Sequence, residues 1–188
     1  MNGSMLKVTS STVTRLYIEG AASLDPITVF LEDFEPNKGQ ITVSCWGKSW
    51  TAFWGGMWDG LTVGQFFTKL NADYIIGYFS PQLRSSKFSG EALVEKARKQ
   101  ILKDRRTFCL DKDGARELYD EAGDLENAQS VDCLWGGHSD LLTRLFGDEW
   151  WYAADEATES NPDYEYLCRI IAAVQQALKQ KEPSHDNQ

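Results

Sequence analysis

The first third of the chain alternates between apolar and polar positions with a period near two, which is typical of β-strands. Four runs follow this pattern: residues 12–19, 27–34, 40–46 and 49–54. Between the second and third runs, Pro36 presets φ and Gly39 accepts a positive φ, so a tight turn is expected there. Short connections of this kind join antiparallel neighbours. The pattern therefore predicts an antiparallel meander of three or four strands.

Beyond residue 60 the apolar positions change to a helical spacing. Thr62 and Gln65 have the spacing of a capping box at the start of the first helix. Helices are predicted over residues 63–70, 72–79, 89–106, 111–122, 130–146 and 161–181. The helix over residues 130–146 is expected to loosen at Gly136 and Gly137. Gly147 is a suitable residue to end it.

These elements indicate an α+β fold, in which the N-terminal antiparallel meander packs against four or five C-terminal helices. The length of 188 residues favours one domain over residues 1–188, with flexible ends at residues 1–11 and 182–188. A second domain would need a boundary near residues 81–89.

The composition restricts the kind of partner. The net charge is −9, and repulsion from phosphates disfavours direct binding of nucleic acid or of an anionic membrane. A protein with a basic surface is the better match. No apolar run approaches the roughly 20 residues needed to cross a bilayer. Whether the chain forms a homodimer is left open.

The residues that hold metals and cofactors do not cluster. The four cysteines are scattered, which favours reduced thiols, and a zinc site would need thiolates and imidazoles close together. The sequence contains neither a phosphate-binding loop nor a dinucleotide-binding glycine motif. We therefore expect no metal and no cofactor.

Four tryptophans recur at every fourth position: Trp46, Trp50, Trp54 and Trp58. In a strand or in a helix, this spacing keeps side chains near one face. One interpretation is that the rings form the core face of the sheet under the helices. The other is that they form an exposed aromatic platform for a partner, because the segment is rich in glycine.

Charged residues suggest two further surfaces. Carboxylates gather in the C-terminal half, where Asp148 and Glu149 lie beside Trp151. They form either an ordinary solvated surface or a patch that occupies a basic groove on another protein. One predicted helix is instead basic, and its candidate contacts for nucleic acid, or for an acidic protein, are Lys96, Lys99, Lys103 and Arg106. A solvated helix face explains these cations equally well, and the acidic net charge argues against a nucleic-acid interface.

Catalytic patterns are weak. Cys133 and His138 are five positions apart, and a cysteine nucleophile needs a base within hydrogen-bonding reach. Asp148 and Glu149 are adjacent, whereas a glycosidase holds two carboxylates across the scissile bond. A small hydrolase that uses either pair is an alternative. The sequence favours a protein without catalytic residues.

Several segments resemble a family of small accessory proteins encoded by tailed phages and prophages of enteric bacteria. They are TRLYIEGAASLDPITVFLEDF, GQITVSCWGKSWTAFWGGM, ADYIIGYFSP, FGDEWW and NPDYEYLCRIIAAVQQALK. The resemblance implies a dispensable phage gene whose product acts in the bacterial cytoplasm. Such products often inhibit or modulate host proteins, including those of defence systems. The leading hypothesis is therefore a phage protein that binds a host protein, with a nucleic-acid-handling complex as one target.

Overall fold

The computed structural model describes residues 6–58 and 60–181, which form two compact units. The sheet unit comprises residues up to Leu83 together with those from Asp163 onward, and the helical unit comprises Arg84–Pro162. The boundary near residue 83 falls within the segment where the sequence would allow a second domain to begin. Whether the two units unfold together as one domain stays a prediction.

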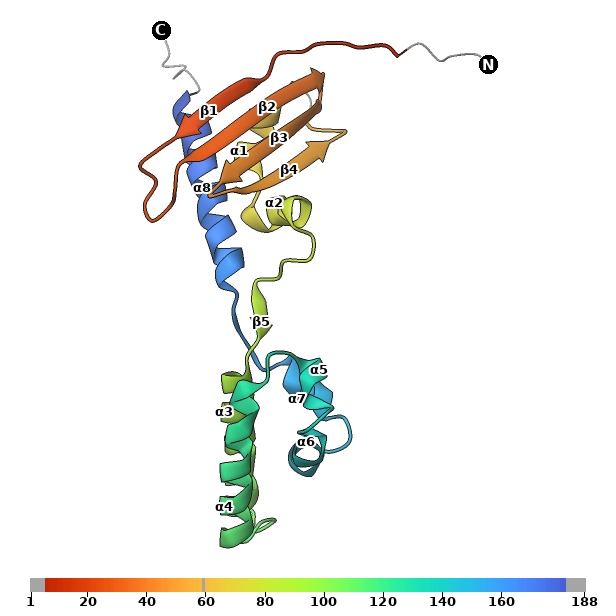
Figure 1. Cartoon of the computed structure of the whole chain (residues 1–188), viewed down its shortest axis with the longest axis vertical. Helices are drawn as coiled ribbons and strands as arrows, with labels where there is room; N and C mark the ends of the chain where they lie inside the picture. Colours follow the sequence, from red (N-terminus) through yellow and green to blue (C-terminus); the bar gives the residue numbers. More distant parts are fainter. Residues whose placement is uncertain (1–5, 59, 182–188) are drawn as a thin grey trace, which may run out of the picture. The chain divides into compact units, whose positions relative to one another are not determined.

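The sheet unit is built on a four-stranded antiparallel meander, in the order β1-β2-β3-β4 (Figure 1). Its strands are β1 (Thr14–Ile18), β2 (Ile27–Glu35), β3 (Lys38–Cys45) and β4 (Lys48–Trp54). Buried and half-buried side chains alternate along β3, so Ile41, Val43 and Cys45 point to the core. The α+β class and the N-terminal meander are thus confirmed.

The β3–β4 hairpin ends in a two-residue turn. Cys45 pairs with Lys48, which leaves Trp46 and Gly47 as the turn residues, with φ of 48° and 72°. Two successive positive φ angles are the signature of a type I′ turn, whose twist matches that of the strands. The predicted third strand therefore ends one residue early, before Trp46.

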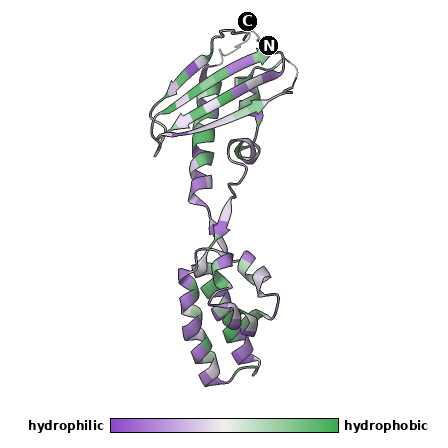
Figure 2. Cartoon of the chain, turned by 45° about the vertical axis from the view of Figure 1, so that its right-hand side comes forward, coloured by the Kyte–Doolittle hydropathy of each residue, from purple (hydrophilic) through white to green (hydrophobic). Residues whose placement is uncertain are grey.

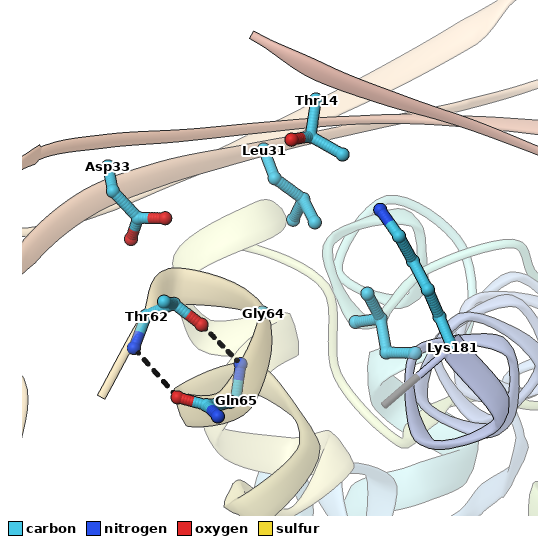
Figure 3. Close-up of a pocket in the computed structure, with 8 residues that line it drawn as sticks. Thr14, Leu31, Asp33, Thr62, Gly64, Gln65 and Lys181 are labelled. Carbon is cyan, nitrogen blue, oxygen red and sulfur yellow. Dashed lines mark hydrogen bonds between the residues drawn. The ribbon is translucent and has the colours of Figure 1, made fainter. Parts of the chain in front are cut away.

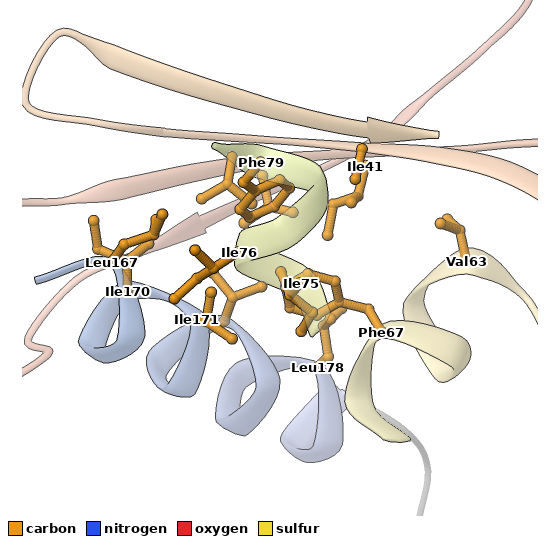
Figure 4. Packing of buried hydrophobic residues seen from close by; sticks show 14 of the residues in the cluster. Ile41, Val63, Phe67, Ile75, Ile76, Phe79, Leu167, Ile170, Ile171 and Leu178 are labelled. Atoms are coloured by element: carbon orange, nitrogen blue, oxygen red, sulfur yellow. The ribbon is translucent and has the colours of Figure 1, made fainter. Parts of the chain in front are cut away.

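Three helices cover one face of this sheet: α1 (Val63–Lys69), α2 (Ala72–Phe79) and α8 (Pro162–Lys181). The capping box is present: Thr62 Oγ1 accepts a hydrogen bond from the backbone amide of Gln65, and the side-chain oxygen of Gln65 accepts one from the backbone amide of Thr62. Apolar residues line α8 under the sheet (Figure 2). Figure 4 shows how Leu167, Ile170 and Ile171 of α8 pack with the side chains of α1, α2 and Ile41.

Helix α8 also closes the end of α1. The side-chain amide of Gln175 donates to the Phe67 carbonyl at 2.9 Å and to the Leu70 carbonyl at 2.8 Å. The last carbonyls of a helix lack the usual partner in the following turn, so these bonds add donors at the C-terminus of α1, where the Leu70 amide also donates to the Phe67 carbonyl at 3.4 Å. The sheet unit therefore needs the chain's final helix to be complete.

The helical unit has its own core. Its helices are α3 (Gly90–Arg106), α4 (Lys112–Glu121), the 3-10 helix η1 (Ala122–Asn127), α5 (Val131–Leu134), α6 (Ser139–Phe146) and α7 (Trp150–Asp155). The predicted helix over residues 130–146 is split into α5 and α6, with Gly136 and Gly137 between them. Gly147, with φ of 82°, ends α6 as expected. The pattern did not indicate η1 or α7.

A short ribbon joins the ends of the helical unit. Strand β5 (Ser86–Phe88) pairs antiparallel with β6 (Thr158–Ser160). Backbone bonds extend the ribbon on both sides, from Asn161 N to Ser85 O and from Ser89 N to Ala157 O, each 2.9 Å long. The predicted flexible ends are only partly described: residues 6–11 have no regular structure, and residues 1–5 and 182–188 lie outside the described residues.

Candidate functional site

Four aromatic rings come together on the helical unit, and we call this group the aromatic cluster: Trp135, Trp150, Trp151 and Tyr152. Trp150 is buried and forms the base of the cluster. The ring centroid of Trp135 lies 4.6 Å from that of Trp150, and Trp135 stacks on Trp151 at 6.0 Å with 23° between the planes. Tyr152 lies 5.9 Å from Trp151.

The cluster is open to solvent despite its size. Trp135 is 54% exposed and Tyr152 is 62% exposed, whereas Trp151 is half-buried. The space beside the backbone after Trp135 is open, because a Cβ atom added at Gly136 or Gly137 would have no neighbouring atom within 4 Å. Large aromatic side chains that stay exposed around a buried ring are typical of protein-binding surfaces.

Carboxylates surround these rings. Residues 131–160 contain seven Asp and Glu but only one Lys or Arg, which is Arg144. Lys96 pairs with Glu156 at 2.5 Å and Lys87 pairs with Glu159 at 3.1 Å. The others are exposed and form no ion pair with a described residue: Asp132, Asp140, Asp148, Glu149 and Asp155.

The spacing of residues along the chain predicts a carboxylate near each of the rings Trp135, Trp151 and Tyr152. Side chains three or four positions apart are neighbours on a helix surface. Asp132 precedes Trp135 by three positions, and Asp155 follows Trp151 by four. Glu149 precedes Tyr152 by three, and the Tyr152 amide donates to the Glu149 carbonyl at 3.1 Å. The result is an aromatic surface with an acidic rim.

Comparison with known proteins assigns a family. The model of a phage family, Phage_phiTE_072, matches residues 6–180. The chain belongs to this phage family. Comparisons with curated proteins and with solved structures gave no match. Among the described helices of this phage protein, none combines the length and apolar character needed to cross a bilayer.

The structure separates the four regularly spaced tryptophans of the phage protein. Trp54 is 3% exposed, and its ring meets those of Phe66 and Phe67 at 5.4 and 6.4 Å. Trp50 is half-buried against the same core. These two residues fit the core interpretation of the pattern.

The other two of the four are exposed at different places. Trp46 lies in the hairpin turn and is 75% exposed, and Trp58 is 56% exposed. Trp58 packs its edge on Phe66 and has the Lys69 ammonium 6.0 Å from its centroid. The period of four therefore does not produce one continuous platform.

The predicted acidic residues Asp148 and Glu149 lie next to the aromatic cluster in the chain. Asp148 and Glu149 directly precede α7, so the chain brings them to the aromatic cluster together with Trp151. Sequence reasoning missed Trp135 and Tyr152. Trp135 is separated from α7 along the sequence, and only the packing of α5 against α7 brings its ring to the cluster.

The cations of α3 are partly neutralised. Lys96 donates to Glu156 and to the Ala153 carbonyl, and its bond holds the pKa of the Glu156 carboxyl below its ordinary value. Lys99 pairs with Glu95 at 2.7 Å. Lys103 and Arg106 are exposed in the last turn of α3, where cations favourably meet the negative end of the helix dipole.

In the described part of the chain, Cys133 lies in α5 and His138 is the N-cap residue of α6. Cys133 Sγ lies 3.2 Å from Ser130 Oγ, and no hydrogen bond joins Cys133 to His138 there. His138 is the N-cap residue of α6 but makes no side-chain cap bond. No group of metal-binding side chains occurs among the residues that the structure describes.

The sheet unit has a groove of about 260 Å³ (Figure 3). Three of its polar side chains are already engaged: Asp33 accepts from the Val63 amide at 2.6 Å, and Thr62 and Gln65 bond each other. Leu178 and Lys181 of α8 complete the wall. The bond from Val63 to Asp33 gives this side of the groove a structural role, because it joins α1 to the sheet.

Proposed function

We propose that this phage protein is an accessory protein that binds a host protein with a basic surface and modulates its activity. The observation that supports this is the aromatic cluster with its acidic rim. Buried aromatic anchors dominate the affinity of most protein interfaces, and surrounding charges steer the approach of an oppositely charged partner. The phage family provides the context in which a host protein is the natural partner.

The proposal includes the bacterial cytoplasm as the place of action and a host of the enteric group. Inhibition of a defence system, or of a complex that handles nucleic acid, is one form that it takes. Proteins of that kind have basic grooves for phosphates, and carboxylates can occupy such grooves. The unpaired carboxylates around the cluster would repel nucleic acid itself.

The test is affinity capture from a host lysate with matched variants of the full chain. Trp135→Ser combined with Tyr152→Ser removes two exposed rings of the cluster, while Trp150 stays in the core. Tyr17→Ser is the control, because Tyr17 is 56% exposed on the sheet unit. Far-ultraviolet circular dichroism checks that each variant is folded.

We expect a host protein that the wild type and the control capture, and that the double variant does not. The purified partner should then bind in solution, with an affinity that falls as salt is added. Capture by the double variant at the wild-type level would refute the assigned surface, and a partner without a basic surface would refute the electrostatic part.

A further inference from the structure

Some aromatic rings among the described residues have a cation of the chain over their face, and the rings of the aromatic cluster do not. Four aromatic rings elsewhere carry one: Arg15 lies over Tyr17, Lys69 over Trp58, Arg98 over Tyr119 and Arg169 over Tyr166. The distances to the ring centroids run from 4.5 to 6.0 Å. Within the described residues, no Lys or Arg takes such a position over the cluster.

The residues near the cluster explain why no cation of the chain reaches it. Arg144, the single basic residue of its segment, pairs with Glu121 at 3.8 Å. Lys96 is held by Glu156 and by the Ala153 carbonyl. The exposed rings are thus accompanied only by carboxylates, and the surface lacks the positive charge that would complement both.

We propose that the aromatic cluster binds arginine side chains of the partner protein, an inference that rests on the proposed function. A guanidinium is planar, stacks on an indole or phenol face, and donates two parallel N–H bonds to a carboxylate. Trp135, Trp151 and Tyr152 each have a carboxylate at helical spacing, so we expect ring and acceptor to lie close together. An ammonium forms neither the planar stack nor the bidentate bond.

The ring geometry favours several guanidinium groups over one. Trp135 and Trp151 are stacked on each other, and Trp135, which is 54% exposed, leaves part of its ring open to a partner. Tyr152 lies beside Trp151 with its planes inclined at 43°, and it offers a third face in another direction. A segment with spaced arginines fits these faces better than an isolated side chain.

The test uses two fluorescent peptides of nine residues, in which arginine or lysine alternates with glycine and serine. Their binding to the full chain is measured by fluorescence anisotropy at low and at physiological salt. Arginine should bind about three- to tenfold more tightly than lysine, since stacking and the bidentate bond add to the shared charge attraction. Tyr152→Ser should weaken the arginine peptide by about two- to fivefold.

Two charge variants separate a specific site from a general acidic field. Asp132→Asn with Asp155→Asn removes two carboxylates beside the rings and should reduce the preference for arginine. Asp113→Asn with Glu117→Gln removes the same charge from α4 of the same unit and should leave the preference unchanged. Both pairs are exposed, so neither is expected to unfold the chain.

The two proposals can fail separately. Equal affinity for the two peptides, or an equal loss of preference in the α4 variant, would overturn arginine recognition. If ring-dependent capture of a host protein persisted in that case, the proposed function would stand. If the chain prefers the arginine peptide but captures no host protein through its rings, the proposed function would be refuted. Arginine recognition by the aromatic cluster would stand.

Discussion

The double hydrogen bond from Gln175 offers a sharp test of how the sheet unit is held together. Substituting leucine keeps the approximate size of the side chain but removes both donors from the Phe67 and Leu70 carbonyls. Phe67 is fully buried, and its carbonyl would keep only the longer bond from the Leu70 amide, at 3.4 Å. Loss of a hydrogen bond at a buried acceptor costs up to about 1–3 kcal/mol, and the second carbonyl, on the half-buried Leu70, adds less.

We therefore expect Gln175→Leu to lower the free energy of unfolding of the sheet unit by about 1–3 kcal/mol. Urea denaturation, monitored through the hydrogen exchange of β3 amides, should show a urea concentration at the unfolding midpoint that is lower by about 1 M. Gln176→Leu is the matched control, because Gln176 is the next residue and is exposed. A loss below about 0.5 kcal/mol, or an equal loss in the control, would refute the role assigned to the α8–α1 bonds.

Three further predictions follow from the same packing. In Gly90→Ala, the added Cβ would lie 2.5 Å from the Leu125 carbonyl oxygen, so thermal unfolding monitored by near-ultraviolet circular dichroism should show a loss of about 1–3 kcal/mol in the helical unit. Trp150→Ala should lower the free energy of unfolding of the helical unit by about 3–5 kcal/mol. If hydrogen exchange of the β3 amides accelerates equally, the two units unfold as one domain. If exchange of those amides is unchanged, the units unfold as two domains. The bond to Asp73 raises the pKa of Tyr164 to about 12, and the bond to Cys45 raises the pKa of Tyr166 to about 12. These two bonds should therefore stabilise the fold fully below pH 10, and their contribution should be lost as pH rises through 12. Tyr→Phe at both positions should flatten this loss when the free energy of unfolding is measured across alkaline pH.

The meander could be predicted because each of its determinants is local. Alternation of apolar residues, a proline-glycine turn and short connections define four strands without reference to the rest of the chain. The turn at Trp46 shows the limit of this reasoning. A tryptophan after a run of β-branched residues continues the strand pattern, but the following glycine and the pairing of Cys45 with Lys48 place it at positive φ instead.

The candidate site could be predicted only in part, because its residues meet through packing. Asp148, Glu149 and Trp151 were identified from composition, since they are neighbours in the sequence. Trp135 directly follows α5, and the packing of α5 against α7 brings its ring to the cluster. No periodic pattern encodes a contact of this kind, whereas the spacing of the four N-terminal tryptophans suggested a shared face that the strand and its turn divide.

The connections of the helical unit indicate why the proposed site lies where it does. Its two ends are joined by the β5–β6 ribbon and by the bond from Asn161 N to Ser85 O, so the chain leaves this unit beside the point where it entered. Segments whose ends are close together can be inserted into another fold with little disturbance of its core. The sheet unit keeps its own core through α8, and the helical unit keeps its own around Trp150. We therefore expect that substitutions on the rim of the aromatic cluster leave the core of the sheet unit intact.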